Sequence, residues 1–500
     1  MDVWRTKSVE QSIGDTDEPE HRLKKDLTAL DLTVFGVGVT IGAGIFILTG
    51  RVAASNAGPA VALSFVVAAV ACGLAALCYA EFASSVPVAG SAYTFSYATH
   101  GELVAWIIGW DLILEFVIGA AAVASGWSGY LASVLEGTAF ELPASITDAD
   151  SGAVNLPAGL LVLALTGILI AGIKLSSRIN EVVVAIKVAI VLFVIVAGIG
   201  LIDTANYTPF IPPAADAPAE SAGFLDTPMV QTLFGLESAV YGWGGIVTGA
   251  AVVFFAFIGF DVVATTAEET RNPQRDLPRG ILGALAICAL LYGAVALVIT
   301  GMQSYQDIDE ADPAPLATAF SEAGKDGFAD IIAIGAVVGL VVVVMILLLG
   351  QSRVAFAMSR DGLLPRGLSR VHPRFGTPYI ITTVVGVFVA VIATFFPIGE
   401  LAELVNVGTL FAFILVSIGV VVLRRRRPDL PRAFRVPLSP VLPIFAALVS
   451  FYLMLNLSGE TWVRFLIWMA LGLVIYFAYG ASHSRLADQE RSAAGPGSTP

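Results

Sequence analysis

Residues 33–46 read TVFGVGVTIGAGIF, an apolar run that four glycines interrupt. In one reading, Gly38 and Gly42 form a GxxxG pair that lets a second membrane helix approach closely. In the other, the helix unwinds near Gly42 to Gly44, and a second half-helix offers free N–H groups and a positive dipole end that can hold a carboxylate. A dinucleotide-binding loop is excluded because the spacing differs and no strand precedes it. Both helical readings stay open on this stretch alone.

A second interrupted run, FFAFIGFDVVATTAEE at residues 254–269, carries Gly259 and Asp261. It is the sixth apolar segment of the chain, five after the first. Glycine-interrupted segments at matching places in two halves of a chain indicate a transport site at the interface between two repeats. Because the first and sixth segments enter the membrane from opposite sides, the pattern predicts two inverted halves, 30–202 and 247–423.

The composition is that of an integral membrane protein. Of the 500 residues, 57% are hydrophobic and only 13% are charged, whereas soluble proteins have about 25% charged residues to cover their surfaces. The net charge of -13 argues against nucleic-acid binding, which needs basic surfaces. A membrane helix needs about 20 mainly apolar residues. Twelve such runs lie near residues 30–50, 58–81, 101–134, 157–174, 178–202, 247–268, 279–301, 329–357, 377–396, 401–423, 437–456 and 462–480. We therefore predict an all-α membrane protein with twelve transmembrane helices.

The lysines and arginines predict the orientation, because these residues gather on the cytoplasmic side of a membrane. With the N-terminus inside, only Arg51, Lys325 and Arg464 fall outside, and the outer loops are acidic. Both termini are then cytoplasmic, and the protein is expected in the cell membrane. The predicted order is a cytoplasmic tail (1–29), a first repeat (30–202), an extracellular loop that is ordered or semi-ordered (203–246), a second repeat (247–423), an inner loop with two further helices (424–480) and a disordered cytoplasmic tail (481–500).

Few charged residues remain at membrane depth, where each is costly. Asp111 and Glu115 are four residues apart and so share a helix face; Asp111 is interpreted as structural, while Glu115 fits a structural role or ligand contact equally well. Lys187 either snorkels to the inner interface or is a buried ammonium that loses its proton in one conformation and regains it in another, as a proton-driven carrier requires. No metal-ligating cluster and no Ser–His or Cys–His pair falls at depth, so neither a metal centre nor an enzyme is predicted.

At these residues the chain resembles the amino acid-polyamine-organocation (APC) superfamily, and within it the cationic amino acid transporter branch and its prokaryotic relatives. GVTIGAGIFILTG at residues 38–50 is similar to the GxGIF signature of the superfamily, and FFAFIGFDVVATTAEETRNPQRDLPRGI at 254–281 follows the branch pattern nearly position for position. Further matching stretches are WDLILEFVIGAAAVASGWSGY, AIKVAIVL, NYTPFIPP and GQSRVAFAMSRDGLLP, at residues 110–130, 185–192, 206–213 and 350–365. The resemblance covers about residues 30 to 480.

The resemblance implies the five-plus-five inverted-repeat fold of the LeuT type, with broken helices 1 and 6, and transport by alternating access. Carried over by position, the groups that would bind an amino acid are the backbone amides of Ala43 and Gly44, with Ile41 nearby, for its carboxylate, and the carbonyls of Phe255, Ala256 and Ile258 for its ammonium. Gly42 and Gly259 would be the points where the two helices break.

The same resemblance implies supporting and coupling residues. Glu115 and Asp261 would support the region between helices 1 and 6, and Lys187 matches a lysine that stands in related proton-coupled carriers where sodium sits in sodium-driven ones. The part of the eighth span that should adjoin the pocket, residues 341–349, contains apolar side chains and no acid, so a neutral, small or apolar amino acid fits better than arginine or lysine.

The expected function is therefore a secondary amino acid transporter that imports a neutral or broad range of amino acids with protons. Within the class, the alternatives are exchange of one amino acid for another and uniport of cationic amino acids. From another class, the alternative is an amino acid sensor that does not transport. The expected partners are the amino acid, protons and the lipid bilayer; no cofactor is expected.

Overall fold

The structure of the protein is a computed structural model, and it describes residues 26–85, 92–93, 96–97, 101–147, 149, 154–172, 177–216, 223–235, 239–260, 262–263, 266, 270–432 and 434–486. Parts of the predicted repeats and of the 203–246 loop fall outside these residues, and so do three further predicted features. They are the role of Asp261, the N-terminal tail up to residue 25, and the C-terminal tail from residue 487.

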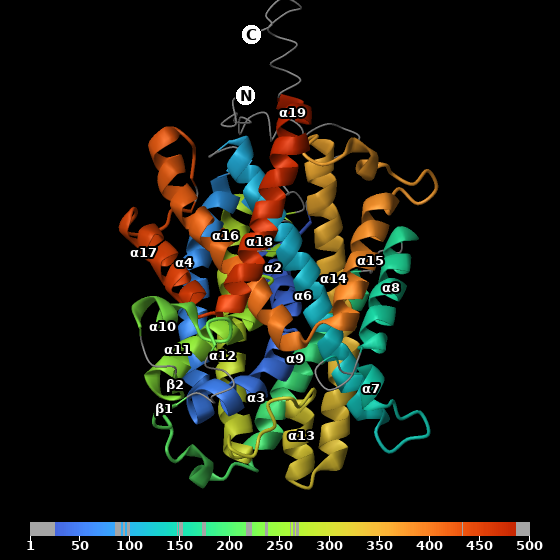
Figure 1. The fold of residues 1–500 in the computed structure, drawn as a ribbon, viewed down its shortest axis with the longest axis vertical. Coiled ribbons are helices and arrows are strands. Elements are labelled where there is room, and N and C mark those ends of the chain that lie inside the picture. The colour runs from blue at the N-terminus through green and yellow to red at the C-terminus, as the bar shows by residue number, and fades with distance from the viewer. Residues whose placement is uncertain are drawn as a thin grey trace, which may run out of the picture.

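The described chain is almost entirely helical (Figure 1). Seven helical stretches are long and apolar enough to cross a membrane, and five shorter apolar helices accompany them. The main helices of the seven stretches are α4 (Val61–Ser85), α6 (Glu102–Leu135), α9 (Ser177–Ile199), α12 (Pro273–Met302), α14 (Asp326–Arg360), α16 (Ile398–Arg426) and α18 (Gly459–Ile475). The shorter helices are α2 (Ala29–Thr40), α8 (Leu156–Ile170), α11 (Gly242–Val253), α15 (Tyr379–Phe395) and α17 (Val441–Leu455).

The five shorter helices differ from the expected length of about 20 residues. Three of them begin at a proline: α8 has Pro157 in its first turn after the N-cap Asn155, and α15 and α17 directly follow Pro378 and Pro440. Proline lacks an N–H donor and is tolerated in a helix mainly in its first turn, so it sets where these helices start. The other two, α2 and α11, end where the helical backbone is interrupted.

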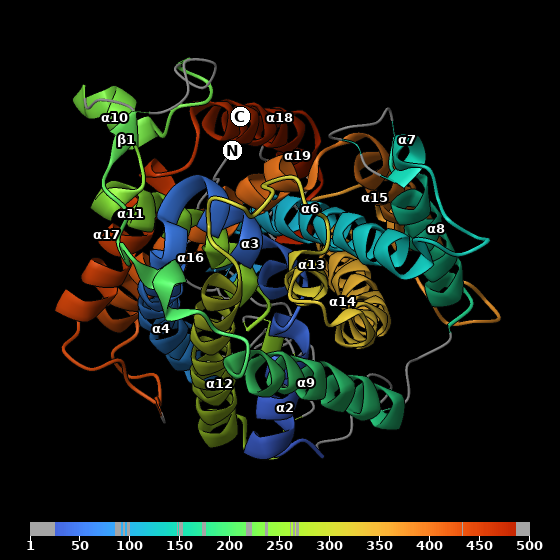
Figure 2. The same cartoon turned by 90° about the horizontal axis from the view of Figure 1, so that it is seen from below.

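The helices form one bundle around α6, which is buried along most of its length, from Glu102 to Tyr130. α14 and α16 pack along α6, and α12 packs along α4 and α2. Seen along the bundle in Figure 2, α8 and α15 lie on one flank of α6 and α14, while α4, α16 and α17 lie on the other. The ends of the bundle are named below after the short helices α19 (Ala481–His483) and α13 (Pro315–Glu322), which lie at the top and bottom of Figure 1.

The predicted extracellular loop between α9 and α11 contains short elements of its own. They are a 3₁₀ helix at Thr204–Tyr207, α10 (Met229–Phe234), and the two-residue antiparallel strands β1 (Ala215–Asp216) and β2 (Ala239–Val240). Backbone hydrogen bonds tie this segment to the bundle, from Asp203 N–H to the Gly301 carbonyl at 2.9 Å and from Met229 N–H to the Leu457 carbonyl at 3.0 Å. The described part of the loop is therefore attached to the ends of α12 and α17.

Candidate functional site

The first apolar segment is broken at Ile41, just before the glycines at positions 42 and 44. α2 ends at Thr40, Ile41 is extended with φ -70° and ψ 93°, and a π-helical turn begins at Gly44. A Cβ built on Gly44 would lie 2.3 Å from the Ala256 Cα, so only glycine permits this approach. The alternative interpretation, in which Gly38 and Gly42 let a second helix approach, applies to Gly38. A Cβ on Gly38 would lie 2.3 Å from Val184 of α9. Gly38 thus serves helix packing, and the break follows Thr40.

The sixth apolar segment is broken as well. α11 ends at Val253, a 3₁₀ turn follows over Phe254–Phe257, and Ile258 is extended with ψ 138°. Gly259 has φ +114°, a conformation that residues with a Cβ rarely adopt. A Cβ there would also lie 2.7 Å from Val39 Cγ1. The backbone requirement at Gly259 explains why this position is glycine.

The two breaks lie side by side, which no local pattern in the sequence specifies. Gly44 touches Ala256, and Gly259 lies against Val39 at the end of α2. The structure therefore brings together the two sets of predicted binding residues. Ile41, Ala43 and Gly44 are buried on one side, and Phe255, Ala256 and the half-buried Ile258 face them on the other.

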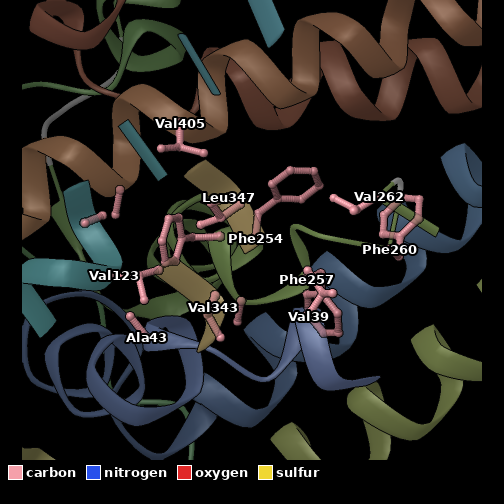
Figure 3. Packing of buried hydrophobic residues seen from close by; sticks show 14 of the residues in the cluster. Val39, Ala43, Val123, Phe254, Phe257, Phe260, Val262, Val343, Leu347 and Val405 are labelled. Atoms are coloured by element: carbon pink, nitrogen blue, oxygen red, sulfur yellow. The ribbon is translucent and has the colours of Figure 1, made fainter. Parts of the chain in front are cut away.

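Apolar side chains surround the paired breaks (Figure 3). They come from the two breaks and from three further helices, and they are Val39, Ala43, Val123, Phe254, Phe257, Val343, Leu347 and Val405. Val343 of α14 stands next to the first break, since its Cγ1 would lie 3.5 Å from a Cβ built on Gly42. The predicted contribution of residues 341–349 thus reaches the site through Val343 and Leu347, and neither carries a charge.

Lys187 of α9 ends on the carbonyls of the broken first helix. Its side chain is fully buried, and its Nζ donates hydrogen bonds to the carbonyls of Gly38 and, at 3.1 Å, Ile41. Gly339 of α14 makes room for it, because a Cβ there would lie 2.5 Å from the Lys187 Cγ. The snorkelling interpretation is therefore wrong: the ammonium points into the protein, where carbonyl oxygens that the broken helix leaves without an N–H partner accept it.

The acidic residues of α6 are both buried. Glu115 is 2% exposed and Asp111 is fully buried, one turn apart on the same helix. Asp111 packs against α16, where a Cβ on Gly408 would lie 2.9 Å from its Oδ1. Neither of its carboxylate oxygens has a hydrogen-bond partner among the described residues, so the structural interpretation of Asp111 stays a prediction. The supporting role of Glu115 stays a prediction.

Three polar side chains that sequence reasoning missed also bind backbone carbonyls of the breaks. The Tyr292 hydroxyl donates to the Thr40 carbonyl at 2.8 Å, and the Tyr130 hydroxyl donates to the Phe46 carbonyl at 2.7 Å. Asn406 of α16 is fully buried, and its Nδ2 donates to the carbonyls of Ala251 and Val252 at 2.8 and 2.9 Å, in the last turn of α11. A side-chain amide within an apolar run is unusual, and this was the signal in the sequence that could have identified Asn406. Nothing marked the tyrosines, because a tyrosine in an apolar run usually indicates packing.

Comparisons with known proteins agree with this architecture. A sequence profile of the amino acid permease family matches residues 27–478. The chain is 47% identical to the branched-chain amino acid permease BcaP of Bacillus subtilis (strain 168), over 97% of this chain and 99% of that one. It is 46% identical to the methylthioribose transporter of the same strain, over 93% of this chain and 95% of that one, and 33% identical to the vacuolar cationic amino acid transporter 4 of Arabidopsis thaliana, over 96% of both.

A profile that spans nearly the whole helical bundle, relatives aligned almost end to end, and seven apolar stretches long enough to cross a membrane lead to one conclusion. The chain belongs to the amino acid permease family of the APC superfamily, and it is a multi-pass membrane transporter rather than an enzyme.

Proposed function

We propose that this permease imports apolar, branched-chain amino acids across the cell membrane together with protons, by alternating access. In this proposal all twelve apolar helices span the membrane, both termini are cytoplasmic, and residues 30–202 and 247–423 form the inverted repeats of a LeuT-type fold. The seven long and five shorter apolar helices, and the adjacency of the two broken segments, support it. Helices shorter than the bilayer core can be accommodated by local thinning of the bilayer.

The paired breaks provide the groups that would bind the amino acid backbone. The turn that starts at Gly44 has amides without intrahelical partners, which would hold the carboxylate near Ile41 and Ala43. The carbonyl groups of Phe255, Ala256 and Ile258 are at the negative end of α11 and would hold the ammonium. The Phe255 carbonyl already accepts the Ile258 N–H at 3.2 Å, and its second lone pair can still accept a hydrogen bond.

The observation that carries proton coupling is the position of Lys187. A fully buried ammonium that donates to the Gly38 and Ile41 carbonyls links its charge to the geometry of the first break. If Lys187 loses its proton, the attraction to these carbonyls weakens, and the broken helix is free to change its position. Proton binding and the conformation of the substrate site are thereby connected through the same backbone atoms.

The proposed preference for an apolar substrate side chain rests on two observations. They are an apolar wall beside the breaks, made of Val123, Val343 and Leu347, and the names of the relatives. Val123, Val343 and Leu347 provide dispersion contacts for a branched side chain and no partner for a cation. A relative at 47% identity is named a branched-chain amino acid permease, which favours the same class here. Methylthioribose and cationic amino acids are the competing substrates, because relatives at 46% and 33% identity are named for them.

Uptake by the purified protein in liposomes tests this function. Leucine, isoleucine and valine are offered alongside methylthioribose, arginine and alanine, with and without an imposed pH gradient. We expect the branched-chain amino acids to be accumulated when the outside is acidic. Uptake that ignores the gradient and requires an internal amino acid would indicate exchange, preference for arginine would indicate the cationic alternative, and binding without flux would indicate a sensor.

A substitution in the apolar wall tests the substrate class separately. Val343→Ala removes two carbon atoms from the wall beside Gly42. At about 0.8 kcal/mol per buried methylene, the KM for leucine is expected to rise about fifteenfold. The KM for alanine should stay within about twofold, because alanine does not reach the wall. The control is Val338→Ala on the same helix, where the side chain is 40% exposed and both KM values should be unchanged. An equal rise for leucine and alanine contradicts this role.

Asn406 is expected to position the end of α11. Asn406→Ala removes the amide that donates to the Ala251 and Val252 carbonyls, and of the two only Val252 keeps another donor among the described residues, the Phe254 N–H. An unpaired buried group costs about 1–3 kcal/mol, so we expect the adjoining carbonyls to shift and the KM for leucine to rise about tenfold. The control is Asn456→Ala, which removes an amide donating to the Tyr452 carbonyl at 2.8 Å at the end of α17. It should lower the melting temperature without raising the KM. The same pattern for Asn406→Ala would leave Asn406 a purely structural role.

A further inference from the structure

An arginine-rich segment covers the end of α16 and the residues after it, at the α19 end of the bundle. Residues 424–435 read RRRRPDLPRAFR and contain six arginines and one aspartate, in a chain whose net charge is -13. The segment leads to α17, which lies at the edge of the molecule (Figure 1). Because α16 and α17 are apolar helices of a membrane protein, the segment between them stands where the bilayer meets water.

Two of the arginines hold the segment in place. Arg424 donates to both carboxylate oxygens of the buried Glu81, at 2.7 and 2.6 Å, and to the Val436 carbonyl at 3.0 Å. Arg432 lies 3.5 Å from the same carboxylate and donates to the carbonyls of Arg427 and Leu430 at 2.7 and 2.9 Å. The segment is therefore anchored to the end of α4 rather than being a free loop.

Two other arginines have no acidic partner of this kind. Arg425 and Arg435 are exposed, and neither forms a hydrogen bond or ion pair within the part of the chain that the structure describes. The two carboxylates of this region are engaged, Glu81 with Arg424 and Arg432, and Asp429 with Arg427 at 3.4 Å. The pKa of Arg432 is lowered overall. Burial is the largest cause, the like charges of Arg424 and Arg435 add to it, and Glu81 opposes it. Positive charge is thus left uncompensated at Arg425 and Arg435.

Exposed apolar residues follow Arg435 in the chain. Leu438 is 79% exposed and has φ +50°, a left-handed conformation that is strained for a bulky residue. Val441 and Phe445 follow one turn apart on α17 and are 68% and 54% exposed. A strained backbone that turns a leucine outward is unfavourable in water, whereas at the boundary between headgroups and acyl chains the side chain is buried in lipid.

We propose that Arg425 and Arg435 bind the phosphate of an anionic phospholipid, with Leu438 and Val441 against its acyl chains. Guanidinium groups match phosphate oxygens with paired hydrogen bonds, and clusters of basic residues next to a membrane helix attract anionic lipids. A soluble phosphate would satisfy the arginines but not the apolar surface. This site is separate from the paired breaks and does not depend on the proposed substrate or on proton coupling.

Native mass spectrometry of the purified full-length protein in mild detergent tests the site. Phosphatidylglycerol and phosphatidylcholine with identical acyl chains are titrated against wild type, Arg425→Gln/Arg435→Gln, and the control Arg370→Gln/Arg374→Gln, which removes two exposed arginines elsewhere. We expect a phosphatidylglycerol site that phosphatidylcholine does not fill. Its affinity should fall about thirtyfold in the first double variant, at about 1 kcal/mol for each arginine, and stay within twofold in the control.

Two further measurements distinguish a phospholipid site from a site for soluble phosphate. Leu438→Asn should weaken phosphatidylglycerol binding about fivefold. Because asparagine tolerates the positive φ of this position, the substitution should not lower the melting temperature in detergent. Millimolar glycerol phosphate should not displace the lipid. Displacement by glycerol phosphate, equal binding of the two lipids, or equal loss in both double variants would overturn the proposal and leave the arginines as determinants of orientation alone.

Discussion

Replacing Lys187 with alanine is expected to abolish accumulation of leucine driven by a pH gradient. The substitution removes the buried ammonium that contacts the Gly38 and Ile41 carbonyls, and with it the proposed proton-binding group beside the first break. One unit of pH gradient supplies about 1.4 kcal/mol per proton, enough for about tenfold accumulation if one proton accompanies each substrate. Uptake into liposomes with an acidic exterior should therefore end near equal concentrations on both sides, instead of about tenfold higher inside.

Two variants separate coupling from folding in this experiment. Lys325→Ala removes an exposed lysine at the start of α14 and should leave the tenfold accumulation unchanged. Lys187→Met keeps most of the buried volume without a titratable group, so it should lose accumulation as fully as Lys187→Ala while unfolding less readily. Gradient-driven accumulation that survives in Lys187→Met would show that the lysine is structural and that protons couple elsewhere.

Replacing Gly44 with alanine is expected to reduce uptake by at least a hundredfold. The new Cβ would lie 2.3 Å from the Ala256 Cα and 2.8 Å from its nitrogen, and backbone atoms cannot turn aside as a side chain can. The two breaks must then separate, which moves the proposed carboxylate-binding amides away from the proposed ammonium-binding carbonyls. Overpacking of this kind also costs about 1–3 kcal/mol of stability. Initial uptake rates and leucine binding to the purified variant measure the effect.

The matched control lies two residues away. A Cβ on Gly42 would find its nearest neighbour, Val343 Cγ1, at 3.5 Å, which is ordinary van der Waals contact. Gly42→Ala should therefore keep uptake within about threefold of wild type, although it introduces the same methyl group into the same glycine-rich stretch. If both variants transport normally, the approach of the two breaks is not needed for transport.

Local patterns in the sequence predicted the parts of the site that depend on covalent chemistry. Gly259 has a backbone conformation that only glycine adopts easily, and Gly44 leaves no room for a Cβ, so both positions are visible as glycines in apolar runs. Lys187 was visible because a charge at membrane depth is costly and therefore rare. Which of its two roles applies could not be predicted, since the same side chain can extend toward the interface or turn inward.

Contacts between distant segments were not predictable in this way. Asn406, Tyr292 and Tyr130 act on carbonyls that lie 84 to 252 positions away in the chain, and a polar group in an apolar run does not say which carbonyl it will meet. The short lengths of α2 and α11 were missed for a related reason. Hydropathy averages over a break, because the residues at the break are as apolar as those in the helices.

The sequence by itself determined that the protein is helical and resides in a membrane, that its first and sixth segments are interrupted, and that it resembles the APC superfamily. These features follow from composition and local conformation, which neighbouring residues decide. Only the tertiary structure decided that Gly44 meets Ala256, that the ammonium of Lys187 ends on the carbonyls of Gly38 and Ile41, and that an apolar wall faces the breaks. The physical reason is that breaking a helix frees amides and carbonyls, and only packing determines which partners satisfy them.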